Sequence, residues 1–323
     1  MLTKRFGRKI FLTIIVMVAV LPFFLHSCDH DDDSGEGRRE SVTRKITSDI
    51  NPDSLEKYVA WLSNLGTRFA LADNRREIAG ALGDRFTAIG LEGVHLDSFM
   101  IDRYYNDKRY QQWQYNVVAS ISGSLYPDSV CLLGAHYDDN LRSGDPFIAA
   151  PGANDNASGI AAILEIARVL KKNNFVPERT IRFVAFGAEE LGLYGSTDYA
   201  AKALENSESI SMMLNNDMIA YEPTTDPSGW KVDIMDYDNS GGLRAEAEKM
   251  CEKFTSLGFV NDNTYSHQSD SYPFSLNGYR ALFFFAFTFD PDYHSMNDLP
   301  EHCNFEYCSE VVRVSCAMLV YNN

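Results

Sequence analysis

The sequence contains no Cys-x-x-Cys pair, although it has six cysteines in 323 residues. A zinc site built from thiolates is therefore not expected. An odd number of cysteines follows Cys28, so at least one of them is left without a partner within the chain. Cys303 and Cys308 are close enough for a disulfide in an oxidising compartment, but spacing alone does not establish one.

Basic residues are also few. The chain has 29 Lys and Arg against 45 Asp and Glu, a formal net charge of -16, so nucleic acid is not an expected partner. An acidic surface of this kind fits solubility outside a cell. No internal repeat and no linker occurs after about residue 45, and the remaining length suits one large domain over residues 46–323.

The N-terminal segment has the pattern of a targeting signal. Four basic residues precede an apolar run over residues 10–25, which is short for a membrane span. The segment Leu25-His26-Ser27-Cys28 then resembles a bacterial lipobox. We therefore expect a lipoprotein signal peptide over residues 1–27 and a lipid on Cys28; the alternative is a plain membrane-anchor helix.

Residues 28–45 begin with an acidic run over residues 29–37. This composition predicts a flexible tether between the lipid and the domain. An acidic run directly after a lipidated cysteine also resembles the surface-export signal of lipoproteins in Bacteroides-like bacteria. The expected location is the bacterial cell envelope, at the outer membrane and either surface-exposed or periplasmic, with membrane contact only through the lipid.

The rest of the chain alternates between apolar strands and helices. Amphipathic helices over residues 53–64 and 74–89 and a hairpin of residues 94–101 and 114–122 come first. Predicted strands then cover residues 130–135, 180–186, 210–215, 232–235 and 281–287, and predicted helices cover 157–172, 196–205, 242–257 and 306–321. This order predicts an α/β fold with three α/β/α layers and a mostly parallel, mixed central sheet.

Metal-type ligands stand where these strands end. His136, Glu189, Glu190 and Asp217 follow three of them, at the edge where open sheets bind ligands. Asp155 lies in a Gly- and Asn-rich loop before a helix. It could serve as the helix N-cap, as could Asn156, or its two oxygens could bridge two zinc ions.

These residues lie in a set of motifs that makes a family recognisable. The set resembles the secreted di-zinc aminopeptidases, a family that also contains the glutaminyl cyclases, over residues 50–323. The resemblance implies a zinc-peptidase-like phosphorylase/hydrolase-type fold. The motifs are His136-Tyr137-Asp138, Gly152-Ala153-Asn154-Asp155-Asn156-Ala157-Ser158-Gly159, Phe186-Gly187-Ala188-Glu189-Glu190, Asn216-Asp217-Met218, Ser269-Asp270-Ser271 and Tyr293-His294-Ser295-Met296-Asn297-Asp298.

The resemblance implies two zinc ions and peptide substrates. His136 and Asp217 would hold one ion, Glu190 and His294 the other, and Asp155 would bridge them. The remaining carboxylate of the pair, Glu189, would act as the general base that activates water. The expected reaction is hydrolysis of N-terminal residues from peptides, with a free α-amino group received at one zinc.

Three further residues receive supporting roles from the resemblance. Asp138 would orient His136, and Asp270 would orient His294 or shape the pocket. Tyr265 would stabilise the oxyanion. The family often has Ser-Asp-His where this chain has Ser269-Asp270-Ser271, and His267 is a candidate to replace that histidine. The segments 140–151 and 222–230 are expected to rim the pocket.

Two other functions fit the same frame. A glutaminyl cyclase would use one zinc and tends to carry tryptophans in its pocket, one of them before the last histidine. Here that position is Tyr293, and Trp61, Trp113 and Trp230 all lie outside the motifs, so the peptidase is favoured. A catalytically inactive binding module would have lost ligands, whereas this chain keeps every one.

Overall fold

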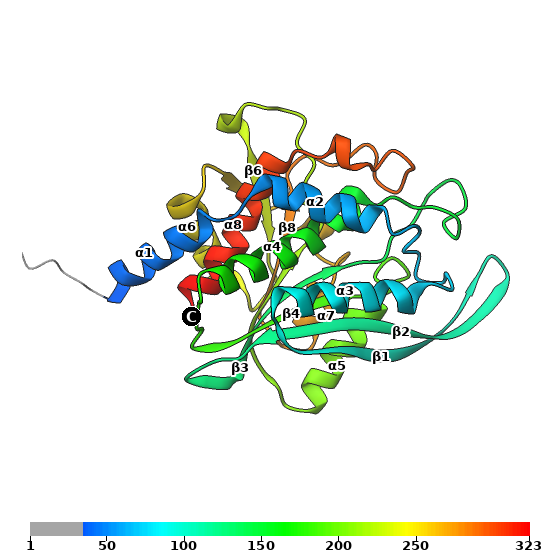
Figure 1. Ribbon diagram of the computed structural model, residues 1–323, viewed down its shortest axis with the longest axis horizontal. Helices are drawn as coiled ribbons and strands as arrows, with labels where there is room; N and C mark the ends of the chain where they lie inside the picture. Colours follow the sequence, from blue (N-terminus) through cyan, green and yellow to red (C-terminus); the bar gives the residue numbers. More distant parts are fainter. Residues whose placement is uncertain (1–34) are drawn as a thin grey trace, which may run out of the picture.

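A computed structural model describes residues 35–323, which form one eight-stranded mixed sheet between helices (Figure 1). The strand order is β1-β2-β4-β3-β5-β8-β6-β7. Neighbouring strands among β4, β3, β5 and β8 are parallel. Strand β2 runs antiparallel to β1 and β4, and β6 runs antiparallel to β8 but parallel to β7. The strands are β1 (Glu92–Tyr105), β2 (Lys108–Ile121), β3 (Tyr126–His136), β4 (Arg179–Phe186), β5 (Ser209–Asn216), β6 (Lys231–Met235), β7 (Gly258–Val260) and β8 (Ala281–Ala286).

Helices cover both faces of the sheet, so the predicted α/β/α layering is confirmed. One face carries α2, α3, α4, α6 and α8, whose apolar residues join the larger core, and the other carries α5 and α7. The helices are α1 (Gly35–Thr47), α2 (Pro52–Ser63), α3 (Arg75–Ile89), α4 (Ser158–Lys172), α5 (Tyr194–Glu205), α6 (Gly241–Phe254), α7 (Ser271–Leu276) and α8 (Phe305–Tyr321).

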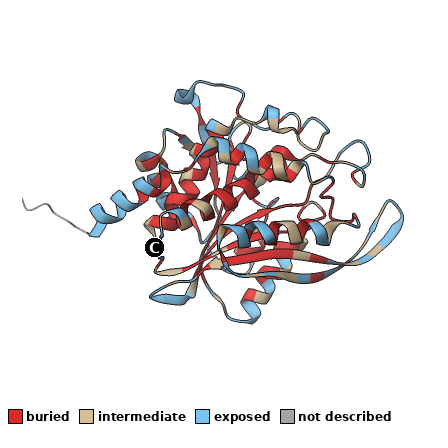
Figure 2. Cartoon of the chain, in the orientation of Figure 1, coloured by how far each residue is buried: buried red, intermediate tan, exposed pale blue. Residues whose placement is uncertain are grey.

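The central strands are buried on both faces (Figure 2). All six residues of β8, Ala281–Ala286, are buried, as is the second half of β3. A continuous apolar run without alternation is what a strand covered by helices on both sides requires. This property made the central strands predictable, and their observed bounds differ from the predicted ones by a few residues at most.

The N-terminal part of the domain differs from its prediction. Helix α1 occupies Gly35–Thr47. The prediction of a flexible tether over residues 28–45 is therefore wrong for residues 35–45. Glu36 and Glu40 on this helix form ion pairs with Lys253 of α6, which hold α1 against the domain. The predicted signal peptide, Cys28 and the first part of the tether lie outside the described residues.

The hairpin is longer than its apolar pattern suggested. Strand β1 ends at Tyr105 and β2 begins at Lys108. Asn106 and Asp107 connect them, with positive φ values of 47° and 61°. This is the backbone of a two-residue hairpin turn, for which Asn and Asp are suited. Within residues 35–323 no helix combines the length and apolarity needed to cross a bilayer.

The parallel strands bring their carboxyl ends to one edge of the sheet. β3 ends at His136, β4 leads into Glu189 and Glu190, and β5 leads into Asp217. Helix α4 starts beside them, and Gly159 in its first turn allows the close approach. A Cβ atom there would lie 2.2 Å from the backbone oxygen of Asn216, so only glycine fits.

Candidate metal centre

One carboxylate lies between two imidazoles at this edge. Asp155 Oδ1 is 3.2 Å from Nε2 of His136, and Asp155 Oδ2 is 3.1 Å from Nε2 of His294. Asp155 is therefore not the helix cap. The side chain of Asn156 takes that part, since its Oδ1 accepts a hydrogen bond of 2.9 Å from the N–H of Gly159.

Each imidazole also faces a carboxylate of its own. Oδ1 of Asp217 is 3.3 Å from His136 Nε2, and both oxygens of Glu190 are 2.8 Å from His294 Nε2. His136, Asp155 and Asp217 thus form one ligand group, and Asp155, Glu190 and His294 form a second. Within each group the ligand atoms lie within 4.8 Å of one another. The structure brings together all five predicted ligands, with Asp155 shared.

The electrostatics of the cluster favour a bound cation. Burial, followed by the charge of Asp155, raises the pKa of Glu190 to about 8. Burial disfavours a charged His136, yet Asp217 and Glu189 outweigh it and raise the His136 pKa well above its usual value. Carboxylates crowded around imidazoles in a buried site suit a divalent metal, and nitrogen and oxygen donors without thiolates are ligands that zinc accepts. The donor set therefore fits zinc.

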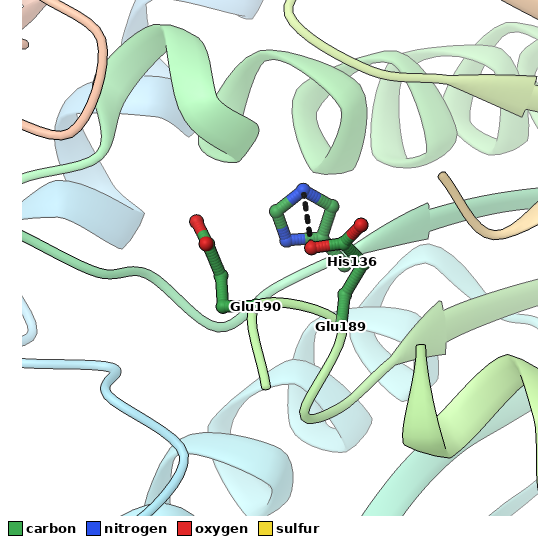
Figure 3. A group of neighbouring side chains, drawn as sticks. All are labelled: His136, Glu189 and Glu190. Carbon is green, nitrogen blue, oxygen red and sulfur yellow. Dashed lines mark ion pairs between the residues drawn. The ribbon is translucent and has the colours of Figure 1, made fainter. Parts of the chain in front are cut away.

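Glu189 is absent from these two ligand groups but forms a third one with His136 and Glu190. Its Oε2 lies 3.9 Å from Nε2 of His136, and its carboxylate is nearly buried. Figure 3 shows the His136 ring between the side chains of Glu189 and Glu190, which rise from the same loop. Burial raises the pKa of Glu189 well above its usual value, and the charge of Glu190 adds to this. A carboxyl group with a high pKa beside a metal site is suited to accept and return a proton.

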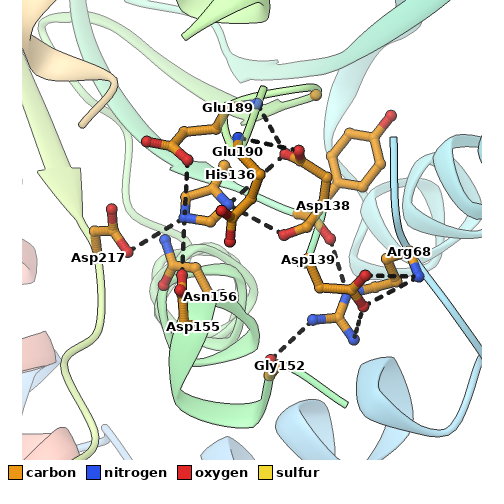
Figure 4. Close-up of polar contacts among 12 residues, drawn as sticks. Arg68, His136, Asp138, Asp139, Gly152, Asp155, Asn156, Glu189, Glu190 and Asp217 are labelled. Atoms are coloured by element: carbon orange, nitrogen blue, oxygen red, sulfur yellow. Dashed lines mark hydrogen bonds and ion pairs between the residues drawn. The ribbon is translucent and has the colours of Figure 1, made fainter. Parts of the chain in front are cut away.

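Asp138 lies against His136, as predicted, and it also holds the glutamate pair. Its backbone oxygen, rather than its carboxylate, is 3.1 Å from Nδ1 of His136, whereas its Oδ1 is 3.7 Å away. The carboxylate instead accepts hydrogen bonds from the N–H groups of Glu189 and Glu190, at 3.0 and 3.2 Å (Figure 4). Asp138 therefore orients the imidazole through its main chain and holds the glutamate pair through its side chain.

Asp270 does not contact His294, so the predicted orienting role is wrong. It is fully buried at the start of α7, and its pKa is raised to about 7, chiefly by burial. The neighbouring residue Ser269 contacts a metal-type ligand instead: its hydroxyl donates a 2.6 Å hydrogen bond to Oδ2 of Asp217. His267 stacks on Tyr272 at 4.3 Å and lines another cavity, so it does not replace the missing histidine.

A cavity of about 420 Å³ opens onto the ligand cluster. Tyr265 lines it, consistent with a place near the substrate, and its ring packs against Phe285 and Phe289. The predicted rim differs in the structure. Of residues 140–151 only Arg142 lines this cavity, and Trp230 lines a separate, larger one. The apolar wall comes from Met218, Phe283, Phe285, Phe289 and Tyr293.

Two supports of the site were not assigned from the sequence. The carboxylate of Asp298 accepts hydrogen bonds from the N–H groups of Asn154 and Asp155, at 2.7 and 3.0 Å. Arg68, 2% exposed, donates to the backbone oxygens of Tyr137 and Gly152. Asp298 belongs to a quoted motif and could have been suspected. Arg68 lies in no such motif, and Tyr137 and Gly152 are 69 and 84 residues away from it.

The described cysteines form no disulfide. Cys303 and Cys308 are both free, as are Cys131, Cys251 and Cys316. Burial raises the pKa of the Cys303 thiol well above its usual value, and none of the five belongs to the ligand cluster. The described cysteines therefore take no part in the site.

The fold and the ligand cluster define a metallopeptidase of the α/β class. The chain belongs to peptidase family M28, whose model matches residues 116–319. This confirms the resemblance noted from the motifs. The match covers the central sheet from the end of β2 onward, together with every residue of the two ligand groups.

Comparison with curated proteins gives relatives of the same kind. The chain is 34% identical over 205 residues to a probable zinc metalloprotease of Pyrenophora teres f. teres, covering 57% of this chain and 43% of that protein. It is 23% identical to a probable aminopeptidase of Saccharomyces cerevisiae over 98% of this chain and 86% of that protein. The chain thus spans less than half of the first relative and most of the second.

Solved structures share the fold. The LapA aminopeptidase of Legionella pneumophila superposes with a TM-score of 0.72 at 20% identity, over 87% of this chain and 74% of that chain. A glutaminyl cyclase of Bacteroides thetaiotaomicron gives 0.66 at 17% identity, over 85% and 98%. Both functions considered from the sequence therefore occur on this fold, and the choice between them depends on the site.

Proposed function

We propose that the protein is a zinc-dependent aminopeptidase that binds two zinc ions. The observation that carries the proposal is the position of Asp155, with one oxygen toward His136 and the other toward His294. This arrangement would let one carboxylate bridge two ions, while Glu189 stays outside both ligand groups and free to move a proton.

The residues suggest how hydrolysis proceeds. Zinc, when bound, supplies the chemistry that lowers the pKa of water and polarises a carbonyl oxygen. Glu189 takes a proton from the attacking water and delivers it to the nitrogen of the leaving amine. The hydroxyl of Tyr265 donates to the oxygen on which negative charge develops. The apolar wall of Met218 and Phe285 holds the first side chain of the peptide.

Glutaminyl cyclisation is the second candidate, because a solved cyclase shares the fold. The site favours the peptidase for two reasons. It offers two ligand groups that share Asp155, where the cyclase expectation needs one zinc. No tryptophan lines the cavity in the described part of the chain, and the residue before His294 is Tyr293.

The deciding experiment measures zinc per chain together with turnover. The soluble domain should start at about residue 34, ahead of α1, because that helix packs on α8 and forms ion pairs with Lys253 of α6. Near two zinc ions per chain and release of the first residue from Leu- and Ala-starting peptides would support the aminopeptidase. One zinc, with Gln-starting peptides cyclised and Leu-starting peptides untouched, would support the cyclase instead.

We also propose that the protein is a lipoprotein of the bacterial cell envelope, anchored through Cys28. The support is the basic segment, the apolar run and the lipobox-like Leu25-His26-Ser27-Cys28. The full chain expressed in a bacterial host should incorporate labelled fatty acid, and Cys28→Ala should abolish the label. A labelled Cys28→Ala protein would exclude this anchor, and protease shaving of intact cells would tell the surface from the periplasm.

A further inference from the structure

Arg142 is a charged group of the cavity for which the proposed mechanism has no use. The other charged side chains that line the cavity are Asp155, Glu189, Glu190 and Asp217, all of them carboxylates placed at the ligand cluster. Arg142 is exposed, and among residues 35–323 its guanidinium forms no ion pair. A guanidinium that lines a peptide-binding cavity, with no carboxylate of the described residues paired to it, is open to an anionic part of the ligand.

The surroundings hold Arg142 in place. Its backbone N–H donates a 2.9 Å hydrogen bond to the backbone oxygen of His294. Its guanidinium lies over the ring of Tyr293 at 4.6 Å, and that ring stacks on His294 at 3.8 Å. Contact with an aromatic face restricts an arginine without using its hydrogen-bond donors. The charge is therefore positioned at the His294 end of the cluster while its N–H groups stay available.

The apolar wall runs from Met218, beside Asp217 of one ligand group, to Tyr293, beside His294 of the other. Met218 directly follows Asp217, and it packs with Phe283 and Phe285 of β8. A peptide whose first side chain rests on the Met218, Phe283 and Phe285 part of this wall would place its scissile carbonyl over the cluster. Its remaining residues would then extend toward His294 and Arg142.

We propose that Arg142 binds a carboxylate in the leaving part of the substrate, close to the scissile bond. This inference rests on the proposed aminopeptidase function and names its substrate class: short or acidic peptides. The carboxylate can be the C-terminal one of a dipeptide or the side chain of an acidic second residue, because each residue adds only about 3.5 Å of extended chain. Both sources present the planar pair of oxygens that a guanidinium binds with two parallel hydrogen bonds.

Four substrates that all begin with leucine distinguish the C-terminal carboxylate from the acidic side chain: Leu-Ala, Leu-Ala-amide, Leu-Asp-amide and Leu-Asn-amide. Release of leucine gives kcat/KM for each. The zinc-loaded wild-type domain should prefer Leu-Ala to its amide and Leu-Asp-amide to Leu-Asn-amide, by about tenfold. A preference in the first pair alone assigns the C-terminal carboxylate, and one in the second pair alone assigns the acidic side chain. Since Arg142 is exposed, added salt should reduce the preference.

Variants of Arg142 complete the test. Arg142→Gln should abolish the preference and leave the two uncharged amides within about twofold of wild type, while Arg142→Lys should keep part of it. Arg109→Gln is the matched control, because it removes an exposed arginine on the hairpin, where its partner is Asp102. Zinc content of every variant is measured alongside.

Two outcomes would overturn the inference without touching the proposed function. One is a wild-type enzyme that shows no preference in either pair. The other is an equal loss on all four substrates in Arg142→Gln, with altered zinc content, which would make Arg142 a support for Tyr293 and His294. A wild-type domain loaded with zinc that hydrolyses none of the four substrates would instead refute the aminopeptidase itself.

Discussion

The hydroxyl of Ser269 donates a 2.6 Å hydrogen bond to Oδ2 of Asp217. This bond leaves Oδ1 of the same carboxylate toward His136, at 3.3 Å. Ser269 in turn accepts a 2.6 Å hydrogen bond from the side chain of Asn215. A chain of buried hydrogen bonds therefore fixes which oxygen of Asp217 faces the ligand group.

Ser269→Ala should weaken zinc binding by about 10- to 100-fold, because outer hydrogen-bond partners orient metal ligands. Competition with a chromophoric chelator measures the affinity. Ser271→Ala is the matched control, since Ser271 is equally buried but its hydroxyl is bonded to Tyr237. Equal zinc affinity in the two variants would show that the Ser269 bond does not orient Asp217.

Glu189→Gln should retain zinc and lose activity by about 100- to 10,000-fold, the usual contribution of a general base. The amide keeps the shape of the side chain but has no proton-accepting carboxylate. Asp155→Ala is the contrasting variant, because it removes the carboxylate shared by both ligand groups and should lose metal. Elemental analysis with leucine release distinguishes them, and a Glu189→Gln enzyme with normal zinc and unchanged turnover would refute the assigned base.

Asp298→Ala should lower both the free energy of unfolding and zinc content. Two backbone N–H groups, of Asn154 and Asp155, would lose their acceptor in a buried site. Hydrogen bonds to a charged group contribute about 1.5 to 3 kcal/mol each, so a loss of about 3 kcal/mol is expected. Urea unfolding gives the change. Asp292→Ala, six residues earlier and facing His302, should have a small effect.

Removal of zinc should lower the melting temperature. Without the ions the cluster of Asp155, Glu190 and Asp217 leaves carboxylates close together around two histidines. A ligand that binds only the folded state at 1,000 times its Kd stabilises it by about 4 kcal/mol. Calorimetry before and after chelation, and after zinc is restored, tests this. An unchanged melting temperature, with zinc shown to be absent, would mean that the cluster does not bind it.

Stability should depend on pH through the buried pair of Arg68 and Asp139, whose side chains are fully buried. Burial raises the pKa of Asp139 from 3.8 to about 7, although Arg68 opposes this. The folded state therefore holds the proton more tightly than the unfolded state. The stabilisation that comes from this tighter proton binding at Asp139 is complete below about pH 4 and is lost as the pH rises through 7.

Arg68→Met should therefore cost about 3 to 5 kcal/mol at pH 8, where Asp139 would be left as an unpaired buried charge, and less at pH 5.5. Unfolding of the metal-free protein at both pH values measures the difference. Arg109→Met, in an exposed pair, should change stability by less than about 1 kcal/mol at either pH. A cost for Arg68→Met that is the same at both pH values would contradict the assignment to Asp139.

The sequence by itself determined the order of the elements and the positions of the metal-type ligands. The run 281–287 has no polar residue, so it could only be a strand covered on both faces. Polar residues directly after such strands must gather at the carboxyl edge of a parallel sheet, which is why His136, Glu189 and Asp217 could be grouped before their distances were known.

Only the tertiary structure decided which groups support those ligands and which residues face the substrate. Ser269 and Asp270 are adjacent and equally buried, yet only Ser269 contacts Asp217. Asp298 reaches Asp155 across 143 residues of chain, and Arg142 reaches the cavity from a loop without periodicity. Such contacts depend on how distant segments pack and on side-chain direction, which local patterns in the sequence do not encode.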